Sequence, residues 1–217
     1  MANTIEVFAN NVSKGTANAD GSGNWSKTIT LSANNYNIKA KSTDTAGNTS
    51  GFSGLKYIRT GDTTKPTIPD LLDDSGSSSS DNITNDSTPR IAYQVTLAYV
   101  SGVAVADASV KGMVLEHAVG SGSFSAIDSP NSGSLTITDN PLGSTKKFSK
   151  TFQVSSALAN GTHKFRCKWT DQNDVASSYS SVLTITIDTT APSAPAITSI
   201  TNGSVIMGTS VPVSGTS

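Results

Sequence analysis

The chain contains few of the residues that mark a reactive or strongly charged protein. Its 217 residues include one cysteine, Cys167, so no disulfide can form within the chain. Charged residues make up 14% of the chain, and Lys+Arg 15 nearly balance Asp+Glu 16, which excludes the basic excess expected of a nucleic-acid-binding protein. No apolar run approaches the roughly 20 residues that a membrane-spanning helix needs, so we expect no membrane span in this chain.

The sequence also lacks the residue arrangements that catalysis needs. Its two histidines, His117 and His163, have no cysteine or histidine partner at metal-ligand spacing. No Gly-x-Ser-x-Gly motif occurs, and the paired carboxylates Asp73 and Asp74 lie in a serine-rich loop that water reaches freely. We expect Cys167 to pack as a small apolar group, with His163 on the opposite face of its strand. We therefore predict that the protein is not an enzyme.

Short segments of alternating apolar and polar residues, separated by turns, follow one another along the chain. Residues 4–8 alternate in this way, residues 25–31 read as a further strand, and Tyr36, Ile38 and Ala40 share one face of the next. Turn-forming Asn, Asp and Gly residues separate these segments. No segment has a helical period of useful length, so we predict an all-β fold class.

A proline-containing pattern divides the chain. It reads IDTTAPSAP at residues 187–195 and GDTTKPTIP at residues 61–69, each time after a run of alternating apolar residues. Proline fixes φ and holds the preceding residue in an extended conformation, so two prolines three residues apart favour a straight connector. We interpret each copy as a short, stiff joint between two modules.

The segments that precede the two joints also match each other. Three pairs of segments align: 25–29 with 148–152, 33–35 with 159–161, and 38–42 with 165–169. Asp44 precedes Asp62 by 18 residues. Asp171 precedes Asp188 by 17 residues. The chain therefore reads as tandem repeats of one β-sandwich unit.

These motifs resemble a known family. The Trp-Ser-x-Thr strand at residue 25, the strand that ends in TDTAGNTS at residues 43–50, and the closing strand before DTTAP are similar to the bacterial immunoglobulin-like repeats of large surface adhesins and biofilm-associated proteins. The acidic segment 73–89 resembles the long first loop of one subtype of those repeats. The resemblance implies tandem immunoglobulin-like β-sandwiches of antiparallel, Greek-key topology, and an extracellular location on the bacterial cell surface.

We predict four parts along the chain. They are an immunoglobulin-like sandwich that lacks its opening strands (1–61), a proline-rich linker (62–69), a complete sandwich with an insertion at about 95–143 (70–190), and a linker with the opening strands of a further module (191–217). Two explanations fit the two ends. The chain is a window from a longer array, or the C-terminal strands of one copy complete the N-terminal module of the next by strand addition.

The resemblance also implies calcium at the joints between modules, and the residues allow it. Calcium takes six to eight hard oxygen ligands, and loops at one end of a sandwich can gather ligands that are distant in sequence. At the first joint the candidate ligands are Asp44, Asn48, Asp62, Asp73, Asp74, Asp81 and Asp86; at the second they are Asp171, Asp174, Asp188 and Asn202. The alternative is that these side chains form Asx-turns within their own loops.

From these observations we predict a structural extracellular repeat segment, a stalk or filament of an adhesin-like cell-surface protein with calcium-stiffened joints. Its expected partners are neighbouring copies or repeats of the same protein, arranged head to tail, and no nucleic acid. The alternative function is a ligand-binding adhesin domain that recognises a glycan or host protein through residues 95–143. An extra hairpin that widens the sheet is the purely structural explanation of that insertion.

Overall fold

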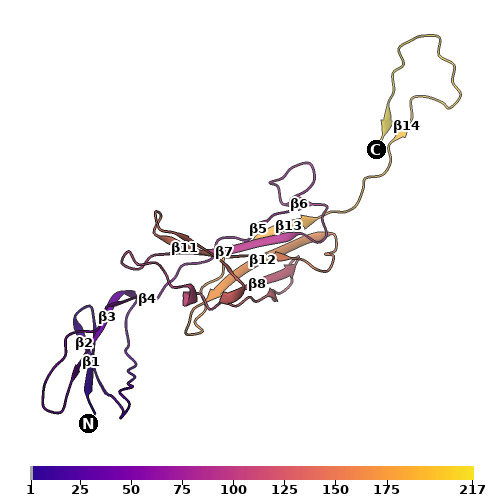
Figure 1. The fold of residues 1–217 in the computed structure, drawn as a ribbon. Helices are drawn as coiled ribbons and strands as arrows, with labels where there is room; N and C mark the ends of the chain where they lie inside the picture. The colour runs from indigo at the N-terminus through magenta and orange to yellow at the C-terminus, as the bar shows by residue number, and fades with distance from the viewer. Residues whose placement is uncertain (1) are drawn as a thin grey trace.

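The computed structural model describes residues 2–217 and confirms the all-β fold class. Two single turns of 3-10 helix, Asp107–Ser109 and Ser132–Ser134, are the only helical elements among the described residues. Neither is long and apolar enough to cross a membrane. Figure 1 shows three parts in a row. We call them the N-terminal module (2–61), the central domain (62–190) and the C-terminal arm (191–217).

The N-terminal module is built on one antiparallel sheet with the strand order β2-β1-β3-β4. Its strands are β1 (Thr4–Ala9), β2 (Val12–Asn18), β3 (Asn34–Thr43) and β4 (Lys56–Thr60). Asn10 and Asn11 form the turn between β1 and β2 with φ values of 49° and 67°. Asparagine tolerates this left-handed conformation, which a tight two-residue hairpin requires.

Residues 25–31 do not form the strand that their alternating pattern predicts. The segment runs beside the sheet but pairs with no strand in residues 2–217. The physical reason is that a strand is stabilised by its neighbour, and the alternating pattern carries no information about whether a neighbour is present.

The central domain contains two larger sheets. One has the order β10-β11-β7-β5, and the other has the order β6-β13-β12-β8-β9. The strands of the first are β5 (Asp70–Leu71), β7 (Arg90–Ala98), β10 (Thr136–Asn140) and β11 (Thr145–Gln153). Those of the second are β6 (Ile83–Thr84), β8 (Gly112–Val119), β9 (Ser125–Asp128), β12 (Gly161–Thr170) and β13 (Leu183–Ile187). All pairs are antiparallel except β6 with β13.

The core of the central domain comes from the inward residues of both sheets. On β12 these are His163, Phe165, Cys167 and Trp169, all at most 5% exposed. The expectation that His163 lies on the face opposite Cys167 is therefore wrong. Side chains alternate with a period of two along a strand, so residues four apart share a face.

Residues 95–143 are only in part an insertion. They include β8, which pairs with β12 along its whole length and so belongs to the central framework of the sheet. They also include β10, which extends the other sheet at its edge beside β11. The added residues thus widen the sheet, as the structural explanation of the insertion predicts.

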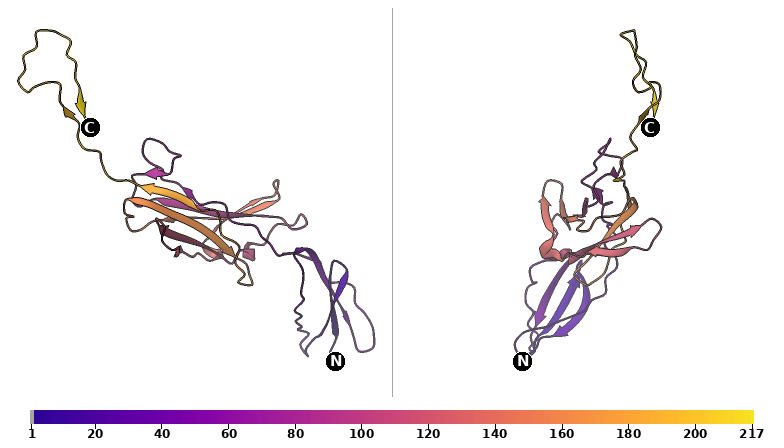
Figure 2. Two further views of the ribbon diagram at one scale, coloured as in Figure 1. Left: turned by 180° about the vertical axis from the view of Figure 1, so that it is seen from behind. Right: turned by 90° about the vertical axis from the view of Figure 1, so that its right-hand side faces the viewer.

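The C-terminal arm projects away from the central domain. Its two short strands, β14 (Ala196–Ile197) and β15 (Gly215–Thr216), pair with each other, and Figure 2 shows the arm reaching outward in both views. Its large apolar side chains are exposed, Met207 fully and Val213 by 60%. The arm therefore offers apolar strands that no other part of the described chain covers.

Candidate functional site at the joints

The first joint is fixed to the surface of the central domain. The indole Nε1 of Trp169 donates a hydrogen bond of 2.8 Å to the carbonyl oxygen of Thr64. The amide of Thr67 donates one of 3.0 Å to the carbonyl oxygen of Gln94. Both prolines of this linker are buried. Linker residues 64–69 are consequently part of the central domain and set the direction from which the preceding module arrives.

Asp62 stands at the start of this joint and is neutralised by an arginine. Its Oδ2 lies 2.5 Å from Nη2 of Arg59, and its Oδ1 accepts a hydrogen bond of 2.9 Å from the amide of Thr64. Burial raises the pKa of Asp62, but the hydrogen bonds from Thr64 and the charge of Arg59 outweigh it, so the pKa lies below its ordinary value. Arg59 thus supplies here the positive charge that a metal ion would supply.

The structure places Asp44 and Asn48 far from Asp62. β3 begins at Asn34, opposite Thr60 beside the linker, and ends at Thr43, opposite Thr4. Asp44 follows the far end of β3, so a strand of about 30 Å separates it from the joint. The grouping of Asp44 and Asn48 with Asp62 does not match this register.

Asp44 instead organises its own loop. Its Oδ1 accepts hydrogen bonds from the amides of Ala46 (2.9 Å) and Asn48 (2.8 Å), and its Oδ2 accepts one from the side-chain amide of Asn48. The side-chain hydrogen bond of Asn48 and these backbone donors lower the pKa of Asp44. This is the Asx-turn arrangement, which uses both carboxylate oxygens without a metal ion.

Asp171 and Asp174 lie at the end of the central domain that faces the first joint, and not at the second joint. Asp171 follows the end of β12 that carries Trp169, whereas the start of β12 pairs with Ile187. Its Oδ1 accepts hydrogen bonds of 2.8 and 2.9 Å from the amides of residues 173 and 175. Asp174 forms an exposed ion pair of 2.5 Å with Lys111.

The acidic loop 72–86 belongs to the second joint. β6 runs parallel to β13, and the amide of Asp188 donates a hydrogen bond of 3.0 Å to the carbonyl oxygen of Thr84. Asp73, Asp74, Asp81 and Asp86 therefore lie at the same end of the central domain as Asp188. The expectation that these four aspartates lie at the first joint is therefore wrong, because the chain runs from the first linker to the opposite end of the domain before it reaches them.

Most carboxylates of this loop already have partners. Asp73 binds Arg90 at 2.7 Å, Asp81 accepts from the amide of Ile83, and Asp86 accepts from the amide of Thr88.

Asp74 differs from them. Its Oδ2 accepts a hydrogen bond of 3.1 Å from the amide of Asn82, but its Oδ1 is buried without a hydrogen-bond partner in the described chain. A buried carboxylate oxygen without a donor is costly and fits a position beside a cation.

The remaining candidates contribute less. Oδ1 of Asp188 accepts from the amide of Thr190 at 3.0 Å. Asn202 is exposed in the C-terminal arm. Within residues 2–217 no group of three or more His, Cys, Asp or Glu side chains converges so that it could hold a metal ion. Any cation at the second joint would thus depend largely on backbone, amide and hydroxyl oxygens, which calcium accepts.

Sequence reasoning missed a contact between the two histidines. Nε2 of His117 and Nδ1 of His163 lie 2.9 Å apart, and Nε2 of His163 is 2.9 Å from the carbonyl oxygen of Ala159. A carbonyl only accepts, so Nε2 of His163 donates to Ala159, and Nδ1 of His163 accepts the hydrogen bond that Nε2 of His117 donates. Burial first, and the charge of His163 second, lower the pKa of His117. Since 46 residues separate the two histidines, no sequence spacing could have revealed the pair.

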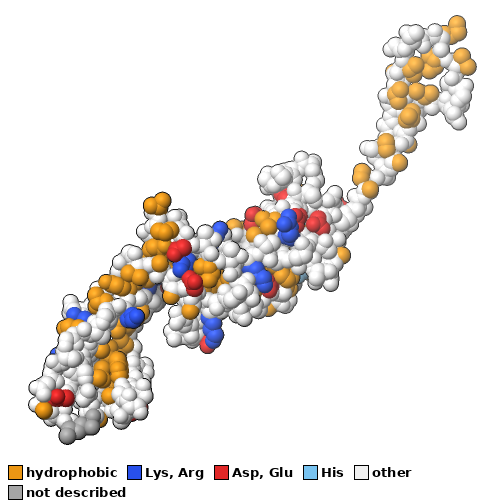
Figure 3. All heavy atoms as spheres, viewed as in Figure 1, with side chains coloured by type: hydrophobic (Ala, Val, Ile, Leu, Met, Phe, Trp, Pro, Cys, Tyr) orange, Lys and Arg blue, Asp and Glu red, His pale blue; other side chains and the backbone are white. Residues whose placement is uncertain are grey.

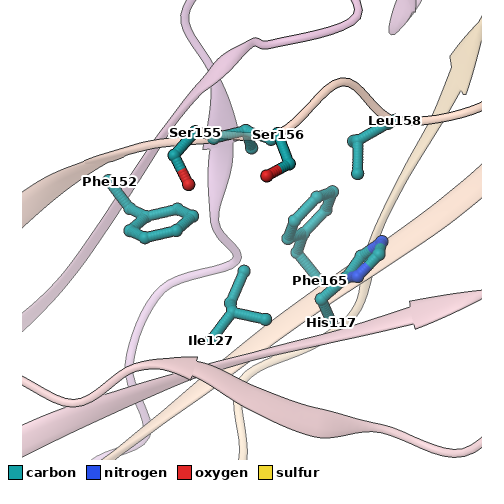
Figure 4. Close-up of a pocket in the computed structure, with 8 residues that line it drawn as sticks. His117, Ile127, Phe152, Ser155, Ser156, Leu158 and Phe165 are labelled. Atoms are coloured by element: carbon teal, nitrogen blue, oxygen red, sulfur yellow. The ribbon is translucent and has the colours of Figure 1, made fainter.

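His117 of this pair borders a small pocket. The pocket has a volume of about 250 Å³, and Figure 4 shows His117, Phe165, Ser155 and Ser156 around it. Cys167 supplies no nucleophile here, because burial raises the pKa of its thiol to about 11. The pocket is mainly apolar, and its one lining histidine, His117, is hydrogen-bonded to His163.

The outer face of the second sheet carries aromatic rings that are already covered. The guanidinium of Arg166 lies 4.0 Å from the ring centre of Phe124 and 3.8 Å from that of Tyr179. Glu116 binds Arg166 at 2.7 Å and accepts a hydrogen bond of 2.7 Å from the hydroxyl of Tyr179. Phe124, the aromatic residue of 95–143 on this face, is therefore not an open platform for stacking a sugar.

Comparison with known proteins gives one match. The model of the family described as bacterial Ig-like domain matches residues 62–141, from the first linker to the end of β10. No curated protein matches the chain. The match covers the first linker and Gln94, to which it is hydrogen-bonded, but not Trp169.

Proposed function

Because the chain carries a bacterial immunoglobulin-like domain, we propose that it is a structural repeat segment in the stalk or filament of an adhesin-like protein of the bacterial cell surface. The observation that carries this proposal is the docked linker, which Trp169 and Gln94 hold by hydrogen bonds of 2.8 and 3.0 Å. A connector fixed in this way transmits direction and tension from one module to the next. Its role is mechanical reach.

Head-to-tail assembly of copies is the second part of the proposal. The N-terminal module leaves apolar side chains exposed around its single sheet, among them Trp25 (43%) and Ile58 (37%). The C-terminal arm exposes apolar side chains at the other end of the molecule, as Figure 3 shows. Contacts between two different surfaces at opposite ends do not close on themselves, so they would build a filament.

We place the calcium ion of this proposal at the second joint only. The observations in its favour are the buried, unpartnered Oδ1 of Asp74 and the position of Asp188 in the same loop cluster. Neither carboxylate has an ion-pair partner in residues 2–217, whereas Asp62 of the first joint has Arg59. When bound, calcium would neutralise these two carboxylates and tie loop 72–86 to the start of the second linker.

Small-angle X-ray scattering tests the mechanical role. We expect an elongated particle whose modules keep a fixed mutual direction across the first joint, with or without a chelator. A compact particle, or one whose scattering requires free rotation at residues 61–64, would contradict the proposal. Removal of calcium by the chelator should change only how freely the C-terminal arm moves at the second joint.

Calcium titration by calorimetry tests the metal site separately. A variant with Asp74→Asn and Asp188→Asn should lose the heat of binding, and Asp44→Asn is the matched control that should keep it. Loss of binding in Asp44→Asn, or no binding by the unaltered chain, would overturn the calcium site and leave the mechanical role standing.

A further inference from the structure

The N-terminal module reproduces one sheet of the central domain. Its strand order, β2-β1-β3-β4, corresponds to β9-β8-β12-β13 of the central sheet. In both, a hairpin supplies the first two strands, a ten-residue strand lies next to the hairpin, and a five-residue strand follows it. The sequence repeats therefore form the same half of a sandwich.

The agreement extends to single hydrogen bonds. In the N-terminal module the amide of Ser53 donates to the carbonyl oxygen of Ala40 at 2.8 Å, and the amide of Ala40 donates to Oγ of Ser53 at 3.0 Å. In the central domain the amide of Ser180 donates to the carbonyl oxygen of Cys167 at 2.8 Å, and the amide of Cys167 donates to Oγ of Ser180 at 3.0 Å. Ala40 and Cys167 are thus equivalent positions.

The two copies differ in what covers their inward face. In the central domain the second sheet, β10-β11-β7-β5, covers Phe165 and Ile185, which are 0% and 1% exposed. At the equivalent positions of the N-terminal module, Ile38 is half-buried and Ile58 is 37% exposed. The N-terminal module has the framework of a sandwich, but its inward face is covered only in part: Val7 and Ala9 of β1 are buried, whereas Ile38 and Ile58 remain partly exposed.

One strand of a covering sheet is present but unpaired. Residues 25–29 align with residues 148–152 of β11, and β11 pairs with all nine residues of β7. Residues 25–31 have no such partner in the described part of the chain. The segment lacks a strand equivalent to β7.

The C-terminal arm contains the start of a strand equivalent to β7. Ala196, the first residue of β14, follows Asp188 by eight residues, as Asp70 at the start of β5 follows Asp62. β14 pairs with β15 in the antiparallel sense in which β5 pairs with β7. The arm has no charged residue from 191 to 217, so covering it would bury no charge. β15 therefore takes the place of the start of β7, and the residues before it take the place of the segment that leads into β7.

The pairings fix a register. Ala92 of β7 lies opposite Thr151 on one side and Asp70 on the other. In the arm, Thr216 lies opposite Ala196, the equivalent of Asp70. Thr216 is therefore the equivalent of Ala92, and its partner is the equivalent of Thr151, which is Thr28.

We propose that residues 213–216 of one copy bind residues 28–31 of a second copy as an antiparallel strand, with Thr216 opposite Thr28. In this register Val213 takes the place of Pro89, which is buried in the central domain. The donor is a second copy because the arm and the N-terminal module lie at opposite ends of one molecule (Figure 1). The inference rests on the head-to-tail assembly proposed above and names its acceptor strand and register.

Disulfide trapping between two variants, each with one added cysteine, tests the register. Thr28→Cys and Thr216→Cys are placed on separate copies of the full chain, mixed and mildly oxidised. Both threonines are exposed in the isolated chain, and the buried Cys167 does not compete. Ser22→Cys, in the exposed turn before the acceptor strand, is the matched control for Thr28→Cys. Sedimentation of the unaltered chain measures assembly independently of the cysteines.

We expect the Thr28→Cys mixture to give about tenfold more crosslinked dimer than the Ser22→Cys mixture, because paired residues hold their thiols at a high local concentration. Assembly of the unaltered chain with equal crosslinking in both mixtures would overturn the register and leave head-to-tail assembly standing. A chain that stays monomeric at every concentration would overturn head-to-tail assembly, and this inference with it.

Discussion

Replacing Val213 by aspartate should strongly weaken assembly without disturbing the folded parts of a single chain. Val213 is 60% exposed in the C-terminal arm, so a carboxylate at this position remains in water as long as the chain is monomeric. In the proposed register the same side chain points into the sandwich of the second copy. The substitution therefore acts on the assembled state alone.

The size of the effect follows from the exposed surface of Val213. Burying a whole valine side chain contributes about 2 kcal/mol, so the 60% still exposed contributes about 1 kcal/mol on docking. Val213→Ala should thus weaken assembly by up to about tenfold. An unpaired buried carboxylate costs several kcal/mol more, so Val213→Asp should weaken assembly by about a thousandfold.

Sedimentation velocity over a concentration series measures both variants against the unaltered chain. Val205→Asp is the matched control, because Val205 is 91% exposed in the irregular part of the arm, outside the donor residues 213–216. We expect assembly to decrease from the unaltered chain and Val205→Asp through Val213→Ala to Val213→Asp. Assembly of Val213→Asp that equals that of the control would refute the reasoning.

Three further predictions concern the central domain. Trp169→Phe removes the hydrogen bond to Thr64, so it should lower the free energy of unfolding, measured in urea, by about 1 kcal/mol. It should also increase the motion of residues 61–64 in amide relaxation measurements, and unchanged relaxation would contradict the anchoring role. The pKa of His117 is lowered in the folded state, so the free energy of unfolding should fall as the pH drops through about 6.5, the ordinary pKa of histidine. His117→Gln should reduce the difference between urea titrations at pH 7.5 and pH 5.5. The Cys167 thiol, with a pKa of about 11, should not react with a disulfide reagent at pH 8 until denaturant unfolds the domain; rapid labelling of the native chain would argue against its burial.

The sequence was sufficient to predict the class of fold and its repeats. Alternating apolar and polar residues identify the strands, and the similar sequences around Asp44 and Asp171 align the two modules. The loops agree as well, because each of these aspartates accepts hydrogen bonds from the amides two and four residues later. These features are local. Short-range pattern and turn chemistry determine them, so they can be read from a single sequence.

The arrangement of the candidate site could not be predicted in the same way. Whether Asp44 lies beside Asp62 depends on the direction in which β3 crosses the module, and a ten-residue strand separates its two ends. The loop that contains Asp74 reaches Asp188 only through the parallel pairing of β6 with β13. Long-range pairing of this kind leaves no signature in the spacing of residues.

Electron microscopy of the purified, unaltered chain tests the central claim most directly. The account predicts unbranched filaments in which each copy joins the next end to end, with a thicker bead for every central domain. Separate particles at every concentration, each with a fully protected N-terminal module in hydrogen exchange, would contradict it, because that module would then be complete without a second copy.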